Sequence, residues 1–191
     1  PVDGIGIGLY NGIHHSIDFK GYLEEGQPLD FIRELILPLE YLSGICYTEQ
    51  KPIVMNDVVN EHQRYLEKMN SKSGKMPESL MYWPLWGSHQ KLLGVITVQS
   101  FTKNAYAAQH QTLLGALASY MAIALQNMQS YHEVTSKNSQ ITDSIRYAKT
   151  IQEALLPSVA QLKKPFADLS LIYKPKDIVS VSYTHLTLPT I

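Results

Sequence analysis

The sequence predicts an α+β fold in which helices flank an antiparallel sheet and a long C-terminal helix follows. Apolar residues alternate with a period of two in "GIGIGLYN" (4–11) and run through "KLLGVITVQSF" (91–101), as they do in strands. From residue 107 the apolar period changes to three and four residues, which is the period of a helix facing a core. Strands that are followed along the chain by helices form a sheet with helices packed on it.

The remaining elements follow from local signals. The first strand is expected to carry Ile5, Ile7 and Leu9 on one face and glycines on the other, so that another group packs closely against the glycines. "NG" at 11–12 predicts a hairpin. The expected elements after that hairpin are a returning strand 13–22, a helix 42–49, a strand 53–57, a helix 58–70, a loop 71–79, strands 80–86 and 91–101 with Pro84 at an edge or bulge, and the long helix.

Two motifs near the N terminus could suggest chemistry. The glycines of "GIGIG" are spaced G-x-G-x-G rather than G-x-G-x-x-G, and no helix follows, so a phosphate-binding loop is not predicted. His14 and His15 are adjacent, and on a strand they would point to opposite sides, which disfavours a shared metal ion. Solvated or pocket-lining histidines are the favoured interpretation.

Composition excludes several classes of function. The formal net charge is -1, which offers no basic surface for nucleic acid or anionic membrane. No run of 18 apolar residues exists, so no membrane contact is expected in this segment, although an anchor upstream of Pro1 stays open. Cys46 is the only cysteine, which fits a cytoplasmic protein without disulfides, and we interpret it as a buried small apolar residue.

Three segments together resemble the GAF domain, a small-molecule sensor fold. They are "LSGICYTEQKPIVMNDV" (42–58), "YWPLWGSHQKLLGVITVQS" (82–100) and "LLGALASYMAIALQNMQSY" (113–131), and the resemblance covers about residues 3–131. It implies a sensor domain over 1–131 whose usual first helix is missing. The Asn, Lys, Phe, Asp, Glu signature of cyclic-nucleotide GAF domains is not reproduced around Lys103 and Tyr106, so that ligand is a minority alternative.

A ligand pocket is expected between the sheet and the 42–70 segment, because helices and loops that cover a sheet face commonly enclose apolar clefts. The small molecule itself is unknown, and no metal or cofactor is expected in this chain. The candidate lining residues are Tyr47, Met55, Tyr82, Trp83 and Thr97.

A second resemblance concerns the C-terminal part. "NSQITDSIRYAKTIQEALLPS" (138–158) and "LSLIYKPKDIVS" (169–180) are similar to the linker and entry of stage-II-sporulation-type (PPM-like) serine/threonine phosphatases. In that family the next residues are Gly-Asp-Phe-Tyr, and their aspartate helps hold two divalent metals. Val181 and Ser182 stand there instead, and "VSYTHLTLPTI" (181–191) resembles translated sequencing-adapter sequence.

These resemblances divide the chain into the sensor domain 1–131, a helical linker 132–157, the start of a truncated phosphatase domain 158–180 and a non-native tail 181–191. This fragment is therefore not expected to catalyse. The parent protein would be a phosphatase that uses Mn or Mg and acts on a phosphoprotein.

The expected function is a regulatory module of bacterial signal transduction that binds a small ligand, dimerises, or does both, and controls the downstream phosphatase. Alternatives are a catalytic phosphatase, which holds for the parent only, or the sensor of a histidine kinase or cyclase. The linker could act as a rigid stalk or as a flexible tether. A homodimer is expected through the helices, using the residues Leu114, Leu117, Met121, Leu125, Ile141, Ile145, Ala148 and Leu155, of which the first four are expected to be partly uncovered.

Overall fold

The computed structural model describes residues 2–37, 39–68 and 75–155. Within these ranges seven strands form one sheet in the order β3-β2-β1-β7-β6-β5, with β4 paired to β2. Every strand pair is antiparallel, which confirms the predicted fold class. The strands are β1 (Gly4–Asn11), β2 (Ser16–Glu24), β3 (Gln27–Leu29), β4 (Ile32–Leu35), β5 (Ile53–Met55), β6 (Ser79–Trp86) and β7 (Leu92–Ser100).

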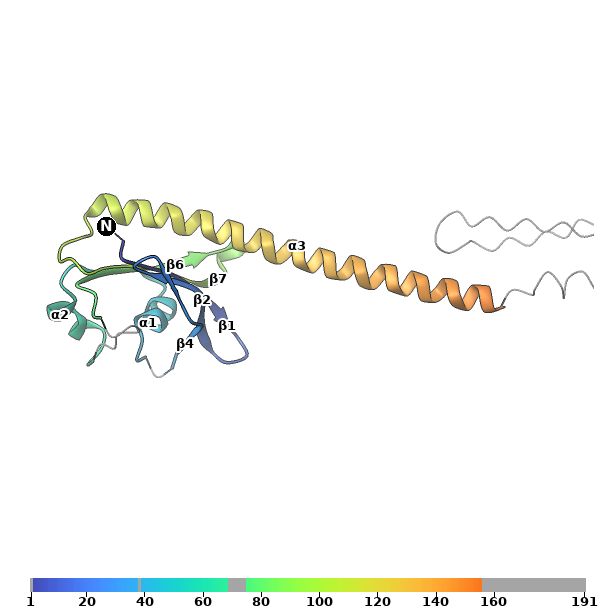
Figure 1. The fold of residues 1–191 in the computed structure, drawn as a ribbon, viewed down its shortest axis with the longest axis horizontal. Helices are drawn as coiled ribbons and strands as arrows, with labels where there is room; N and C mark the ends of the chain where they lie inside the picture. The colour runs from blue at the N-terminus through green and yellow to red at the C-terminus, as the bar shows by residue number, and fades with distance from the viewer. Residues whose placement is uncertain (1, 38, 69–74, 156–191) are drawn as a thin grey trace, which may run out of the picture. The chain divides into compact units, whose positions relative to one another are not determined.

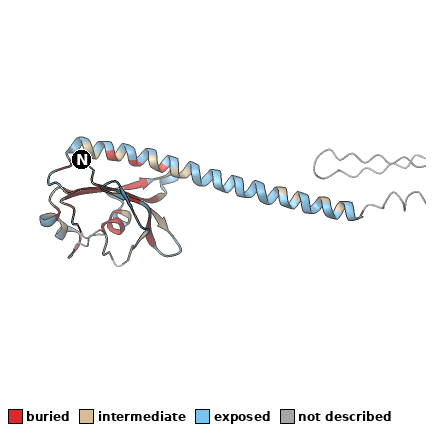
Figure 2. Cartoon of the chain, in the orientation of Figure 1, coloured by how far each residue is buried: buried red, intermediate tan, exposed pale blue. Residues whose placement is uncertain are grey.

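Helices lie on both faces of the sheet in the first compact unit, residues 2–128 (Figure 1). One face is covered by α1 (Leu42–Glu49), α2 (Val58–Glu61) and the 3₁₀ turn His62–Arg64, and we call it the α1 face. The other is covered by the first turns of α3 (Ala108–Leu155), and we call it the α3 face. Figure 2 shows the buried residues gathered along the sheet and on α1.

The glycines of β1 make room for bulky side chains on the α1 face, as the alternation predicts. A Cβ atom on Gly6 would lie 2.8 Å from Cε2 of Tyr22, and one on Gly8 would lie 2.8 Å from Cζ of Phe19. Phe19 and Tyr22 belong to β2 and are buried. Ile5 and Ile7 point the other way and pack on the α3 face.

Helix α3 is continuous for 48 residues and runs through the polar stretch 131–140 without a break. Thr135 and Thr142 donate their hydroxyl groups to carbonyl oxygens four residues earlier, at 2.9 Å each, so these side chains accommodate the helix rather than break it. Residues 129–155 belong to a second unit. Segments 158–180 and 181–191 lie outside the described residues.

Three local expectations differ from the structure. The returning strand begins at Ser16 rather than at 13, because residues 12–15 form the turn. The helix expected over 58–70 ends at Glu61 and passes into the 3₁₀ turn, and its distal residues 69–70 lie outside the described residues. The short strands β3 and β4 were not expected.

Pro84 lies in β6, an interior strand of the sheet. The partner strand β5 pairs only with residues 80–82, so Pro84 has no β5 residue opposite it and its missing N–H breaks no ladder bond on that side. No helix among the described residues is long and apolar enough to cross a membrane.

Candidate functional site

A cleft of 360 Å³ opens where the β1–β2 turn, the chain after β4 and the C-terminal end of α1 meet. Ligand pockets commonly have volumes of about 300 to 1,000 Å³. We call this feature the α1 cleft. Its lining residues are Tyr10, His14, His15, Leu35, Ile36, Leu37, Tyr47, Thr48 and Gln50.

Two tyrosines from different elements form its aromatic wall. The rings of Tyr10 on β1 and Tyr47 on α1 are stacked, with centroids 4.8 Å apart and planes inclined by 23°. The hydroxyl of Tyr10 lies 3.2 Å from Nδ1 of His15. Burial, with a smaller contribution from Tyr10, raises the pKa of Tyr47, so its phenol stays uncharged at neutral pH.

The turn that carries the two histidines is held by hydrogen bonds from Asn11. The side-chain oxygen of Asn11 accepts the backbone N–H of Ile13 at 3.0 Å and that of His14 at 3.3 Å. Its amide nitrogen donates to Asp18 at 2.8 Å. Because this turn replaces the predicted strand, both histidines line one cleft instead of pointing to opposite sides of a strand.

Asp18 anchors this arrangement from inside the sheet. Arg33 donates to both of its carboxylate oxygens, from Nε at 2.8 Å and from Nη2 at 2.9 Å, and the Ser16 hydroxyl donates at 2.7 Å. Asp18 is buried, and its hydrogen bonds to Arg33 in particular hold its pKa well below the usual range. A bidentate ion pair, charged at neutral pH, therefore fixes the β1–β2 turn through Asn11.

The opposite wall depends on a glycine in α1. A Cβ atom on Gly44 would lie 3.2 Å from the carbonyl oxygen of Ile36 and 3.3 Å from its Cα. Helix α1 therefore rests directly on the backbone of this segment, and the Ile36 N–H donates to the carbonyl of His15 at 3.0 Å. The turn, the post-β4 segment and α1 are thus in mutual contact.

Two lining residues have a left-handed backbone. His15 has φ 48° and Gln50, which ends α1, has φ 60°. Residues other than glycine rarely adopt this conformation, because Cβ crowds the carbonyl oxygen. Backbone strain of this kind is concentrated at functional sites.

A buried polar group lies beneath α1. Glu34 on β4 is buried and accepts a short hydrogen bond from the hydroxyl of Ser43. Burial, followed by the nearby Glu34, raises the pKa of Tyr82 well above its ordinary value. Burial also raises the pKa of the Cys46 thiol to about 12, which leaves it unreactive at neutral pH.

The five predicted pocket residues lie in different places. Tyr47 lines the α1 cleft. Met55, Tyr82 and Thr97 are buried in the core of the α1 face, where Tyr82 and Thr97 are register partners on β6 and β7. Trp83 lies on the α3 face, where a Cβ atom on Gly115 would be 3.0 Å from its ring. Strand alternation alone separates Trp83 from Tyr82.

Sequence reasoning missed most of the cleft. Tyr10, Thr48 and Gln50 carry no motif, and they meet only because a turn, a helix end and a strand end converge. For His14 and His15 the sequence favours solvated or pocket-lining side chains. The "NG" signal just before them indicates the turn to which they belong. No group of three or more His, Cys, Asp or Glu side chains that could hold a metal occurs in the described part of the chain.

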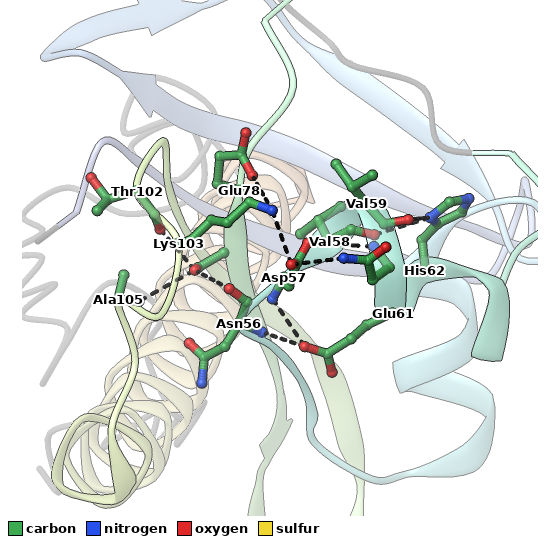
Figure 3. A network of polar contacts seen from close by, with 12 residues as sticks. Asn56, Asp57, Val58, Val59, Glu61, His62, Glu78, Thr102, Lys103 and Ala105 are labelled. Atoms are coloured by element: carbon green, nitrogen blue, oxygen red, sulfur yellow. Dashed lines mark hydrogen bonds and ion pairs between the residues drawn. The ribbon is translucent and has the colours of Figure 1, made fainter.

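A polar network joins the residues that follow β5 to Lys103, in the segment that leads toward α3 (Figure 3). Asn56, which follows β5, donates from Nδ2 to the carbonyl of Tyr106 at 2.9 Å and accepts the Tyr106 N–H at 3.0 Å. The Lys103 ammonium lies 2.9 Å from Asp57, whose pKa it lowers through that hydrogen bond. Glu61 accepts the backbone N–H of both Asn56 and Asp57.

The antiparallel sheet, the helices on both of its faces and the α1 cleft define an α+β domain with a ligand-sized cleft. The GAF domain model matches residues 6–126, and the chain belongs to the GAF domain family. GAF domains are generally regulatory or ligand-binding domains in signalling. No match is found among curated proteins.

Solved structures show the same fold at low identity. The GAF domain of a phosphoenolpyruvate-protein phosphotransferase from Coxiella burnetii is 14% identical, with TM-score 0.54, covering 70% of this chain and 77% of that one. The corresponding Acinetobacter domain is 15% identical, with TM-score 0.52 and coverages of 63% and 69%. A type II free methionine-R-sulfoxide reductase from Thermoplasma acidophilum is 18% identical, with TM-score 0.50 and coverages of 63% and 77%.

Proposed function

We propose that this chain is a regulatory sensor module in bacterial signal transduction, in which a small molecule bound in the α1 cleft controls a downstream serine/threonine phosphatase domain. The observation that carries the sensor role is the α1 cleft itself, a ligand-sized space in a domain of a sensor family. The single buried cysteine supports a cytoplasmic location.

The Asn56 contacts support a route from the ligand face to the helix. They hold the residue after β5 against Tyr106, which immediately precedes α3. A shift of the elements that cover the α1 face would therefore act directly on the beginning of α3. We propose that the helix passes this shift toward residue 155 as a rigid rod, with a flexible tether as the alternative.

The ligand-binding proposal is tested by a thermal-shift screen of small molecules on the whole chain. We expect hits that stabilise the wild type and lose their effect in Tyr47→Ala, while the exposed control Tyr147→Ala keeps it. Hits that are indifferent to Tyr47→Ala would contradict a role for the cleft.

The phosphatase link rests on the resemblance of 138–158 and 169–180 to that family, and it is tested in a protein in which a complete phosphatase domain follows residue 180. One residue inserted after Asn138 rotates everything downstream by about 100°, whereas seven restore the face to within about 20°. A rigid helix predicts that regulation is lost with one and kept with seven. Indifference to both insertions would support the tether.

We do not expect the chain itself to act as a phosphatase. We expect no manganese-dependent phosphoester hydrolysis by residues 1–191, because no carboxylate follows Asp177 and a two-metal site needs several. Turnover would contradict the sensor assignment. Control of a histidine kinase or cyclase remains the alternative output.

We further propose a homodimer through α3. The side of α3 away from the sheet carries exposed Leu117, together with Leu113, Tyr120 and Met128 at helical spacing. Of the residues expected to be partly uncovered, Leu114 is in fact buried against the sheet, and Met121 and Leu125 are half-buried there. Farther along, Ile141, Ala148 and Leu155 are exposed and Ile145 is half-buried.

Sedimentation velocity at tens of micromolar tests the dimer. The double change Leu117→Glu, Tyr120→Glu should convert a dimer to a monomer, because it places charge in the apolar stripe. Ser119→Glu, on an exposed position of the same helix, should leave the dimer intact. A wild-type monomer would contradict the proposal.

A further inference from the structure

The α1 cleft has no permanently charged side chain in its lining. None of its nine lining residues is Lys, Arg, Asp or Glu. Burial raises the pKa of Tyr47, so the phenol of Tyr47 is neutral at physiological pH. A ligand whose phosphate or carboxylate enters this cleft would leave a desolvated charge without a lysine or arginine to pair with, which is costly.

The helix end that borders the cleft adds to this bias. Thr48 and Gln50 lie at the C-terminal end of α1, where unsatisfied carbonyl groups concentrate partial negative charge. This end attracts N–H donors and repels anions. The cleft is therefore opposite in character to an anion site at a helix N terminus.

The shape of the lining favours a flat ring. The stacked pair Tyr10 and Tyr47 offers an aromatic wall, and Leu35, Ile36 and Leu37 supply an apolar one. Aromatic rings prefer offset stacking on such a surface.

Polar groups that both donate and accept hydrogen bonds complete the lining. They are the amide of Gln50, the hydroxyl of Thr48 and the imidazoles of His14 and His15. Nitrogen heterocycles present alternating donors and acceptors in their plane, which matches a stacking wall beside mixed polar groups.

We propose that the α1 cleft binds an uncharged planar nitrogen heterocycle, stacked on the tyrosine pair with its polar edge toward Gln50 and the two histidines, and that it excludes phosphorylated forms of the same ring. This inference rests on the proposed function of the cleft as the ligand site.

Calorimetric titration of the whole chain tests the class with matched probes: adenine, guanine and uracil, their nucleosides, and their nucleoside monophosphates. We expect at least one free base or nucleoside to bind, and its monophosphate to bind at least ten-fold more weakly. Tyr47→Leu should weaken the binding by about ten-fold, the size of one base–aromatic stack. Tyr147→Leu, which replaces an exposed tyrosine on α3, should not change it.

A variant that adds a positive charge to the cleft gives a second measurement. Gln50→Lys places a cation at the polar edge of the cleft, so the monophosphate should gain affinity relative to the nucleoside. Both Tyr47→Leu and Gln50→Lys are checked for folding by circular dichroism, and Gln50 is exposed, so its replacement disturbs no core.

Three results would overturn the class. The first is that monophosphates bind the wild type as tightly as nucleosides do. The second is that the affinity for a base or nucleoside is unchanged in Tyr47→Leu. The third is that none of the nine probes binds. None of these would remove the ligand-binding role, because the thermal-shift screen with Tyr47→Ala tests the cleft with molecules of every class. If the thermal-shift screen gave no hit that depends on Tyr47, both the ligand class and the ligand-binding role of the cleft would be contradicted.

Discussion

The two faces of the sheet achieve close packing in opposite ways. On the α1 face the small residues are in the sheet, where Gly6 and Gly8 of β1 leave space for Phe19 of the neighbouring strand. On the α3 face the small residues are in the helix, where Ala118 and Ala122 are buried against bulky sheet side chains. Placing the small residues in the helix brings its axis close to the sheet.

This difference in packing between the two faces bears on where a ligand site can form. The α3 face is covered by one regular helix and by apolar side chains, and it forms a continuous core. The α1 face is covered by short elements, and it holds the buried Glu34 and the α1 cleft. Short elements leave gaps and need side-chain hydrogen bonds to fix them, which is where a ligand site can form.

The largest expected effect comes from emptying the α1-face core. Phe19→Ala removes a side chain with 0% exposure that fills the space over Gly8, and it should lower the free energy of unfolding by about 3 to 5 kcal/mol. Phe31→Ala, at a position 53% exposed, is the control and should cost far less. Urea denaturation of both variants measures the difference. Equal losses would mean that Phe19 does not fill a close-packed core.

Much of this fold could be predicted from local patterns, and much of the site could not. A period of two predicted β1, apolar runs predicted β6 and β7, which are buried on both faces, and the helical period predicted α3. In β4 the pattern is inverted, since Glu34 is buried and Leu35 is half exposed. The hydroxyl of Ser43 makes that inversion possible, and a contact nine residues away has no local signal.

The next effect concerns the ion pair that holds the turn of the α1 cleft. Asp18→Asn should cost about 1.5 to 3 kcal/mol at neutral pH, since it weakens hydrogen bonds to a charged group. The pKa of Asp18 is depressed in the folded chain, so its contribution is present above the unfolded pKa and is lost as pH falls toward the folded one. The gap between wild type and variant should therefore shrink below about pH 4.

Denaturation at a series of pH values measures that gap. Asp143→Asn, at an exposed position of α3, is the matched control and should stay within about 0.5 kcal/mol of wild type throughout. A gap between wild type and Asp18→Asn that does not change with pH would show that Arg33 does not stabilise the charged carboxylate.

A smaller effect tests the close approach of helix and sheet on the α3 face. Ala118→Leu inserts three carbons where the residue is 2% exposed, and overpacking of this kind costs about 1 to 3 kcal/mol. Ala116→Leu on the exposed side of the same helix should be nearly neutral, because leucine is a good helix former. Thermal denaturation distinguishes them. If Ala118→Leu were also neutral, the small residues would not set the spacing on this face.

The smallest effect is a gain of stability, and it separates the strain of the α1 cleft from its binding role. Gln50 ends α1 with φ 60°, a conformation that costs a side-chain-bearing residue about 1 to 2 kcal/mol and that glycine adopts freely. Gln50→Gly should therefore raise the free energy of unfolding by about 0.5 to 1 kcal/mol. Gln50→Ala keeps Cβ and should give no gain, although both variants remove the same amide from the cleft. Thermal unfolding and ligand titration of the pair should show a difference in stability and an equal loss of binding. If Gln50→Gly were no more stable than Gln50→Ala, the left-handed residue would not be strained, and the strain at the cleft would reduce to His15 alone.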